Sequence, residues 1–312
     1  MTIALGCMGM SGVYGKTDEA QSIAVVHAAI ERGVTFLDTG DHYGAGHNEL
    51  LLGKALAGRR HQVQLSVKFG AMLDVRGGPP GGIDARPAAL RNFLAYSLVR
   101  LGTDYVDVYR PARLDPAVPI EDTIGAIAEL VKAGKVRAIG LSEVGPETIR
   151  RAAKVHPIAD LQIEYSLASR GPEDAIFPVL HELGIGATLY GVLSRGLLSA
   201  SPLKPGDARA HMPRFSGANG EANAKVIAGL QALAQRWGMS ASQLAIGWVL
   251  AKEPRFMPTL GMRTLAQLDE ALSARPLTAD QLAEVEAVSP RGAIAGTRYP
   301  PAAMSALDSE KP

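Results

Sequence analysis

Asp38-Thr39-Gly40-Asp41-His42-Tyr43-Gly44 is the stretch on which the interpretation of this 312-residue chain rests. It follows a short apolar run, 34–37, that is typical of a buried strand, and it precedes an amphipathic segment, 48–56, that predicts a helix. An acid therefore stands at the end of a strand, and a tyrosine follows it in the loop. The next predicted strand, 63–68, ends in Lys68.

These three side chains together predict a proton donor. A tyrosine has a reference pKa of about 10 and is a poor acid at neutral pH, but a nearby ammonium favours the phenolate and lowers that pKa. Lys68 supplies such an ammonium, and Asp38 is placed to hold Lys68 by charge and hydrogen bonding. Taken singly, each residue has an ordinary explanation, as a capping carboxylate, a solvated lysine or a packed Tyr43. The prediction therefore rests on the three occurring at successive strand ends.

The composition excludes several classes of function. Hydrophobic residues make up 47% of the chain and charged residues 20%, which is typical of a globular soluble protein, and the net charge of +1 favours neither nucleic acid nor an anionic membrane as a partner. Cys7 is the single cysteine, which excludes an intrachain disulfide and a cysteine-based metal site and fits a reducing cytoplasm. We find no signal peptide and no apolar run near the roughly 20 residues that span a bilayer. We therefore expect a cytoplasmic protein.

Strands and helices alternate along the sequence. Predicted strands lie at 3–5, 34–38, 63–68, 106–110, 136–141, 161–165, 187–190 and 256–260. A first helix has Ile23, Val26 and Ile30 on one face; it is capped by Thr17 or Asp18 and ended by Gly33. Further helices are predicted at 48–57, 87–100, 120–132, 146–155, 172–183, 222–237, 240–252, 264–273 and 278–288.

Two glycine- and proline-rich segments interrupt this pattern. The run 77–82 resembles an interdomain linker, but the alternation resumes immediately after it, so it is interpreted as a loop and 1–312 as a single domain. The polar segment 196–220 is long for a loop within a compact domain, which predicts a functional or disordered segment.

Eight strand–helix alternations predict parallel strands joined by right-handed crossovers. Both an open doubly wound sheet and a closed (β/α)8 barrel fit that pattern. No Gly-x-Gly-x-x-Gly follows the first strand, and polar candidates fall at the ends of many strands, as in a barrel whose strand ends converge on one active face. These candidates are Asp38, Lys68, Ser142, Gln162, Tyr190 and Gly261. The pattern alone leaves both architectures open.

Several motifs, taken in order, resemble the aldo-keto reductases. They are Gly6-Cys7-Met8-Gly9-Met10, the stretch 38–44, His47-Asn48-Glu49-Leu50-Leu51 with Gly53-Lys54-Ala55-Leu56, and Val67-Lys68-Phe69-Gly70. The likeness covers nearly the whole chain and is to the branch of bacterial pyridoxal-reductase-like and plant perakine-reductase-like enzymes. It implies an α/β fold, the (β/α)8 TIM barrel. The family's N-terminal β-hairpin plug is expected to be absent or shortened, because this chain begins almost at the first barrel strand.

The resemblance also implies a mechanism. A hydride passes from NADPH to the carbonyl carbon of a small aldehyde or ketone, and Tyr43 donates the proton to the carbonyl oxygen as general acid. Lys68 lowers the pKa of Tyr43, and Asp38 pairs with Lys68. The cofactor carries the hydride chemistry, while the protein supplies position and electrostatics.

Cofactor contacts are implied in the same way. Ser142, Glu143 (where many members carry Asn) and Gln162 match positions that bind the nicotinamide carboxamide, and Tyr190 matches the aromatic residue that stacks on the nicotinamide. Gly6, Cys7 and Met8 lie near the nicotinamide, with Cys7 interpreted as packing and not as a nucleophile. The pyrophosphate is expected along Gly191, Leu193, Arg195 and Gly196. The adenosine 2′-phosphate and adenine are expected at Gly261, Met262, Arg263, Gln267 and Glu270, at a helix N-terminus.

Besides Glu143, three positions depart from the family's pattern. At the adenosine end, Thr264 replaces the usual second basic residue and Ala271 the usual Asn, so the preference for NADPH over NADH rests on Arg263. The family's fourth catalytic residue is a histidine in a segment of the form Tyr-x-x-His-Arg-x-Asp-Pro, and Ala112 takes its place here.

The missing histidine leaves two explanations open. One is a slow reductase for generic aldehydes; the other is a substrate that brings or recruits a polar group, with a pocket enlarged for bulkier carbonyl compounds. Arg110 and Arg113 are candidates for that group, although an arginine beside Asp115 is also expected to form a structural ion pair. His42 is next to Tyr43 and could approach the pocket, but as a loop histidine it is expected to face solvent. A rival function is an NADP(H)-binding regulatory or sensor protein with little turnover.

Overall fold

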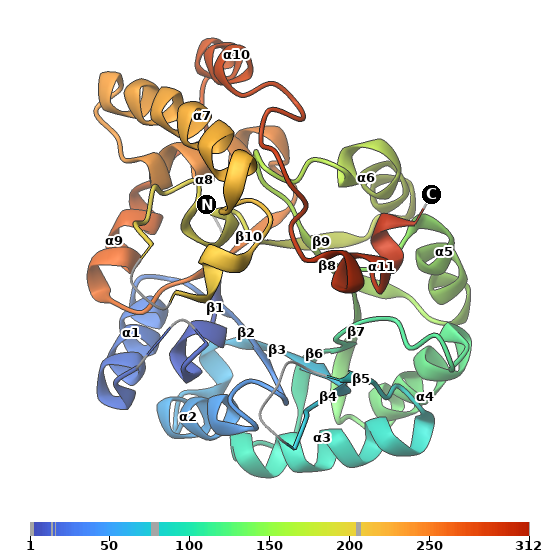
Figure 1. Cartoon of the computed structure of the whole chain (residues 1–312). Helices are drawn as coiled ribbons and strands as arrows, with labels where there is room; N and C mark the ends of the chain where they lie inside the picture. The colour runs from blue at the N-terminus through green and yellow to red at the C-terminus, as the bar shows by residue number, and fades with distance from the viewer. Residues whose placement is uncertain (1–2, 14, 16, 76–80, 204–206, 312) are drawn as a thin grey trace.

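The centre of the molecule is a closed barrel of parallel strands (Figure 1). The computed structural model describes residues 3–13, 15, 17–75, 81–203 and 207–311. The barrel strands are β1 (Ala4–Gly6), β2 (Phe36–Gly40), β3 (Gln64–Phe69), β6 (Val106–Pro111), β7 (Val136–Ser142), β8 (Ile158–Glu164), β9 (Gly186–Tyr190) and β10 (Met257–Gly261). Their hydrogen-bonded order around the barrel is β1-β10-β9-β8-β7-β6-β3-β2. The (β/α)8 barrel is thus confirmed, and the open sheet is excluded.

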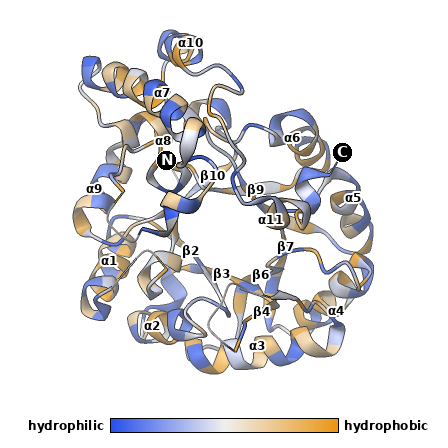
Figure 2. Cartoon of the chain, viewed as in Figure 1, coloured by the Kyte–Doolittle hydropathy of each residue, from blue (hydrophilic) through white to orange (hydrophobic). Residues whose placement is uncertain are grey.

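A ring of helices surrounds the strands in Figure 1. They are α1 (Glu19–Glu31), α2 (His47–Ala55), α3 (Pro87–Leu101), α4 (Ile120–Lys132), α5 (Pro146–Val155), α6 (Pro172–Leu183), α7 (Gly217–Arg236), α8 (Ala241–Lys252) and α9 (Leu265–Ser273). Outside this ring, α10 (Ala279–Val288) packs on α7, and α11 (Pro301–Ser305) belongs to the C-terminal tail. Most carry both hydrophilic and hydrophobic residues, as Figure 2 shows, because one face packs on the barrel and the other faces solvent.

Helix boundaries follow the capping chemistry of the sequence. Asp18 caps α1 by accepting a hydrogen bond from the Gln21 backbone at 2.7 Å. Both α5 and α6 have the predicted bounds, because proline occupies the first helical position of each and Gly184, at φ +67°, ends α6. The buried face of α1 is Ser22, Val25, Val26 and Ala29, so Val26 was placed correctly while Ile23 and Ile30 are only half-buried.

The inside of the barrel is layered. Apolar side chains of Ala4, Phe36 and Val108, packed by Ala138 and Met257, fill one end. Above them lies a polar layer, which is buried although it is charged. Its members are Asp38, Ser66, Lys68, Arg110, Asp160, Gln162 and Thr188. Because a buried charge is costly unless it is paired, this layer is where a functional site is expected.

Some predicted boundaries differ from the structure. β2 runs two residues further than predicted, which places Asp38 inside the strand, and α7 begins at Gly217, which shortens the long loop. The loop after β3 contains an antiparallel hairpin of β4 (Ala71–Met72) and β5 (Gly82–Ile83). The segment 77–80 within that loop lies outside the described residues.

The expected absence or shortening of the N-terminal hairpin plug concerns the first residues that the structure describes. From Ile3 onward, the first element is barrel strand β1, with no hairpin before it in the described residues. In Figure 1 the C-terminal tail, with α11, passes near β8 and β9. Across the described ranges, none of the helices is both long and apolar enough to cross a membrane.

Candidate active site

Asp38 and Lys68 form a direct ion pair inside the barrel. β2 and β3 run in parallel register with Asp38 opposite Ser66 and Gly40 opposite Lys68, so Lys68 lies two residues beyond Asp38 along the neighbouring strand. Asp38 Oδ2 lies 2.5 Å from Lys68 Nζ, while Asp38 Oδ1 accepts hydrogen bonds from Gln162 Nε2 at 2.9 Å and Ser66 Oγ at 3.1 Å. Both charged residues are 4% exposed. The carboxylate is thus fixed on two sides and holds the ammonium in one place.

Tyr43 lies over this pair. Lys68 Nζ is 5.1 Å from the centroid of the tyrosine ring, a cation–π distance. The Tyr43 backbone N–H donates to the Gly40 carbonyl at 3.1 Å. Gly44 follows at φ +58°, where an added Cβ would lie 2.9 Å from Ser11 Cβ. A larger residue at 44 would push the loop outward, so this glycine helps to place the tyrosine beside Lys68.

The charges around Lys68 alter its acidity. Burial lowers the pKa of Lys68 from its ordinary value, the negative charge of Asp38 acts in the opposite direction, and the positive charges of Arg110 and Arg113 lower it further. Desolvation and neighbouring cations both disfavour an ammonium, and the Asp38 contact retains it. Beside the Tyr43 phenol, the charged form of Lys68 is thus disfavoured by burial and by two arginines and favoured by Asp38.

Arg110 belongs to the polar layer and is fully buried. Its Nη2 atom lies 2.5 Å from Asp160 Oδ2, and its Nη1 atom donates to the Leu141 carbonyl at 3.2 Å. The expected ion pair of an arginine with Asp115 is wrong for the described residues, because Asp115 accepts backbone hydrogen bonds, including one from Ala85 at 3.0 Å, and forms no salt bridge there. Arg110 is thus a structural charge that also acts on Lys68.

His42 does not face solvent, which corrects the prediction for this residue. Its side chain is 16% exposed, its Nδ1 atom lies 3.2 Å from Asp41 Oδ1, and its ring meets the Tyr43 ring edge-on at 4.7 Å between centroids. The histidine therefore packs against the ring of Tyr43 in the loop after β2. No sequence pattern distinguished this packing from exposure.

The residues matched to the nicotinamide carboxamide lie together at the ends of β7 and β8. Ser142 is the last residue of β7 and pairs in register with Gln162 on β8. The side-chain nitrogen of Gln162 donates to Asp38 and Thr188, while its side-chain oxygen Oε1 has no hydrogen bond within the described residues. Tyr190 is the last residue of β9 and is half-buried. The Ser142 hydroxyl, the Gln162 amide oxygen and the Tyr190 ring thus lie on one side of the mouth of the barrel, the opening at the C-terminal ends of its strands.

The Glu143 carboxylate accepts hydrogen bonds from three side chains that the sequence did not predict as its partners. Arg298 donates to both carboxylate oxygens, at 2.8 and 2.5 Å, and Tyr190 and Ser309 donate their hydroxyls at 2.8 and 2.6 Å. Burial would raise the pKa of Glu143, but the hydrogen bonds and charge of Arg298 lower it to about 2. The only signal in the sequence was an acid where the family usually has Asn, because a buried carboxylate needs a positively charged partner from another part of the chain.

Ala112 and Arg113 follow the end of β6. Ala112 is buried, and its N–H donates to the Phe69 carbonyl at 2.8 Å, so it extends the β6–β3 ladder beside Lys68. Arg113 is half-buried, and its Nη1 atom donates to the Ala112 carbonyl at 2.6 Å and to Ser142 Oγ at 3.4 Å. The arginine side chain therefore turns toward the mouth of the barrel.

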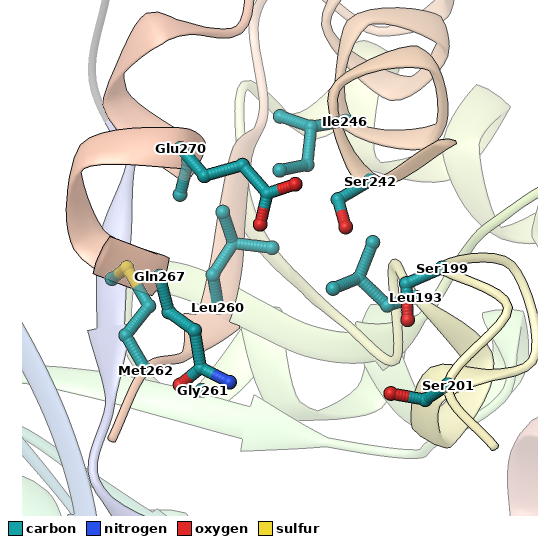
Figure 3. Close-up of a pocket in the computed structure, with 11 residues that line it drawn as sticks. Leu193, Ser199, Ser201, Ser242, Ile246, Leu260, Gly261, Met262, Gln267 and Glu270 are labelled. Carbon is teal, nitrogen blue, oxygen red and sulfur yellow. The ribbon is translucent and has the colours of Figure 1, made fainter. Parts of the chain in front are cut away.

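A cavity of about 270 Å³ opens at the end of β10 (Figure 3). In Figure 3 Glu270 and Ser242 border one side, and Ser199 and Ser201 lie across from Gln267. The lining residues are Leu193, Ser199, Ser201, Ser242, Ile246, Leu260, Gly261, Met262, Gln267, Glu270 and Ala271. The volume is just below the range of pockets for whole drug-sized ligands, and its mixed polar and apolar lining suits one end of a dinucleotide. Five predicted adenosine and pyrophosphate residues meet here.

Arg263 follows the cavity residue Met262 in the chain and directly precedes Thr264, the N-cap of α9. Its backbone N–H donates to Gln267 Oε1 at 2.8 Å, and Thr264 caps the helix by accepting from the Gln267 N–H at 3.2 Å. Glu270 Oε1 accepts from Ser240 Oγ at 2.6 Å. A helix N-terminus, an arginine and a polar cavity together fit a phosphate-bearing nucleotide.

The segment 191–196 after β9 turns sharply between Tyr190 at the strand end and the cavity that Leu193 lines. Gly191, Arg195 and Gly196 have φ of +69°, +54° and +90°. The Arg195 guanidinium lies 4.5 Å from the Tyr299 ring centroid, and its Nη1 atom donates to the Arg298 carbonyl at 3.1 Å. The arginine therefore bridges this turn to the C-terminal tail.

The end of β1 completes the mouth. Gly6 pairs in register with Asp38 on one side and Gly261 on the other. Cys7 is fully buried, its N–H donates to the Asp38 carbonyl at 2.9 Å, and burial raises the pKa of its thiol. Met8 is half-buried. These contacts fit a packing role for the cysteine.

Comparison with known proteins agrees with this geometry. The sequence model of the Aldo/keto reductase family matches residues 2–290. The chain is 39% identical over 306 residues to the probable aldo-keto reductase 1 of Glycine max, an alignment that covers 95% of this chain and 88% of the relative.

Solved structures of similar shape lead to the same group of proteins. A glycerol dehydrogenase from Gluconobacter oxydans superimposes with a TM-score of 0.82 at 26% identity, covering 95% of this chain and 94% of that one. An aldo-keto reductase from Bacillus halodurans, in its holo form, gives 0.78 at 29% identity, covering 93% and 92%.

Proposed function

The chain belongs to the aldo/keto reductase family, and on that premise we propose that it reduces an aldehyde or ketone to an alcohol with NADPH. The observation that carries the proposal is the buried Asp38–Lys68 pair at 2.5 Å, with Lys68 5.1 Å from the ring of Tyr43. A phenol beside a fixed ammonium is a proton donor whose conjugate base is stabilised.

Each residue has a distinct part in this reaction. Tyr43 donates a proton to the carbonyl oxygen, Lys68 stabilises the phenolate that results, and Asp38 keeps Lys68 in position. Bound NADPH supplies the hydride. Ser142, Gln162 and Tyr190 would orient its nicotinamide, while Arg263 and the cavity at Gln267 and Glu270 would hold its adenosine end.

Position 112 sets this chain apart from the family's usual catalytic pattern. We infer that Ala112 stands where that pattern has a histidine, and that the chain belongs to the pyridoxal-reductase-like and perakine-reductase-like branch. The likeness to a plant relative at 39% identity supports the branch. Because alanine has no hydrogen-bond donor, the substrate carbonyl relies on Tyr43 and on groups that the substrate itself recruits.

The test is the loss of NADPH absorbance with a panel of aldehydes and ketones that differ in size. A reductase oxidises NADPH only when carbonyl compound is present and forms the alcohol in equal amount. Tight NADPH binding without turnover of any compound would instead favour a regulatory or sensor protein.

A further inference from the structure

Arg113 differs from the other cations at the mouth of the barrel. Four other buried cations have an acid in contact. The pairs are Lys68–Asp38, Arg110–Asp160, Arg214–Glu164 and Arg298–Glu143. Arg113 forms no salt bridge with any acid in the described residues, although it is half-buried. A guanidinium stays charged at all accessible pH values, so this charge persists without a direct counter-charge.

The bonding of Arg113 leaves half of its hydrogen-bonding fork open. Only the Nη1 atom has partners, the Ala112 carbonyl at 2.6 Å and Ser142 Oγ at 3.4 Å. Nε and Nη2 have no hydrogen bond in the described part of the chain, and neither is among the buried polar atoms sealed from solvent. The two contacts to Nη1 hold the planar group at the mouth, and the remaining donors match the geometry of a carboxylate or phosphate.

The phosphate at the adenosine end of the cofactor does not account for this open fork. Around the barrel, β6 lies opposite β10, where the cavity and the N-terminus of α9 fit the adenosine end of the dinucleotide. Arg113 instead lies across the mouth near Ser142, and its charge acts on Lys68. An anion bound here would belong to the molecule whose carbonyl group reaches Tyr43.

We propose that Arg113 binds a negatively charged group, a carboxylate or a phosphate, on the carbonyl substrate. The inference rests on the proposed reductase function and specifies its substrate class. The carbonyl lies at Tyr43 and the anionic group at Arg113, so the substrate carries the two groups at separate ends. The space left by a small residue at Ala112 gives room for the part that joins them.

Two matched pairs of aldehydes test this. The carboxylate pair is 4-carboxybenzaldehyde and its neutral methyl ester, and the phosphate pair is 4-formylphenyl phosphate and 4-methoxybenzaldehyde. The unmutated protein should favour the anionic member of at least one pair by about tenfold or more in kcat/KM, and the pair with the larger ratio identifies the anion.

Three variants separate charge from geometry. Arg113→Gln should reduce kcat/KM about 10- to 100-fold more for the anionic aldehyde than for its neutral partner, mainly through KM. Arg113→Lys keeps the charge but not the planar guanidinium, so its kcat/KM for the anionic aldehyde should lie between those of the unmutated protein and Arg113→Gln. Arg137→Gln, which removes an arginine 61% exposed on β7, should change neither.

Equal losses for the anionic and neutral aldehydes in both Arg113 variants would overturn the proposal, because Arg113 would then act on the carbonyl or on the fold. So would an unmutated protein that does not distinguish the members of either pair. If no carbonyl compound is reduced, the reductase function fails, and calorimetry decides the anion site separately. Binding of 4-(hydroxymethyl)benzoate to the NADP⁺-saturated protein must then weaken about tenfold or more in Arg113→Gln and not in Arg137→Gln; equal binding by all three proteins would overturn the site.

Discussion

Glu143 and Arg298, 155 residues apart in the sequence, form a two-point ion pair that fastens the C-terminal tail to the end of β7. Both residues are almost fully buried, at 0% and 5% exposure. The same carboxylate accepts the hydroxyl of Tyr190 at 2.8 Å. One ion pair therefore holds both the tail and the aromatic ring proposed to stack on the nicotinamide.

Removing the cation of this pair should destabilise the protein strongly. Arg298→Met leaves Glu143 buried without its main counter-charge, which typically costs about 3–5 kcal/mol in the free energy of unfolding. Urea denaturation measures this cost. The double variant Glu143→Gln, Arg298→Met should recover part of the loss, because position 143 then no longer carries a buried charge without its counter-charge. A loss below about 1 kcal/mol in the single variant would show that the pair does not hold the tail.

The same pair predicts a pH dependence of stability. The pKa of Glu143 falls from 4.5 to about 2 on folding, so its contribution is complete above pH 4.5 and is lost as the pH drops toward 2. The shift corresponds to about 3 kcal/mol. Between pH 7 and pH 3, Glu143→Gln should lose less stability than the unmutated protein. Glu121→Gln is the matched control: hydrogen bonds from Arg151 also lower the pKa of that carboxyl, but the pair lies at the surface, where solvent screens it, so this variant should follow the pH response of the unmutated protein. An equal pH response of the Glu143 variant and the unmutated protein would contradict the assignment.

Cofactor preference should depend on Arg263. An arginine–phosphate contact is charge-assisted, and Thr264 offers no second cation, so we expect NADPH to bind more tightly than NADH. Arg263→Ala should weaken NADPH binding by about tenfold or more and leave NADH binding within about twofold. Fluorescence titration with both cofactors measures this. Equal affinity of the unmutated protein for both would count against the 2′-phosphate site.

Position 112 should set the size of the substrate. A preorganised hydrogen-bond donor is worth about 10²–10³ in kcat, and alanine supplies none. We expect weak turnover of small aldehydes and better turnover of larger or ring-bearing ones. Ala112→His should raise kcat for small aldehydes and impair the bulky ones. The measurement is steady-state kinetics of both proteins on aldehydes of increasing size at fixed NADPH. If small and bulky aldehydes react equally fast and the substitution changes neither rate, position 112 does not shape the pocket.

Local chemistry explains why part of the structure was predictable. Proline at the first position of α5 and α6 fixed where these helices begin, and the strand-end rule placed Lys68 on the active face. β2 ended two residues later than predicted because Thr39 and Gly40 carry no signal that distinguishes a strand end from a loop.

Long-range contacts explain what was missed. Arg298 lies in a Pro/Gly-rich tail without periodicity, and its partner is distant in the sequence, so nothing local marked it as buried. His42 was wrongly expected in solvent because its packing against Tyr43 depends on how the loop folds back. The open fork of Arg113 was equally invisible, since a sequence does not show which arginines lack an acid.

The proton donor is the central claim, and Tyr43→Phe tests it most directly. This variant keeps the ring beside Lys68 and removes only the hydroxyl. NADPH binding, followed by fluorescence titration, should be nearly unchanged, while carbonyl reduction at saturating NADPH should fall by about 10²-fold or more. Near-normal turnover in Tyr43→Phe would contradict the assignment and remove Tyr43 from the mechanism.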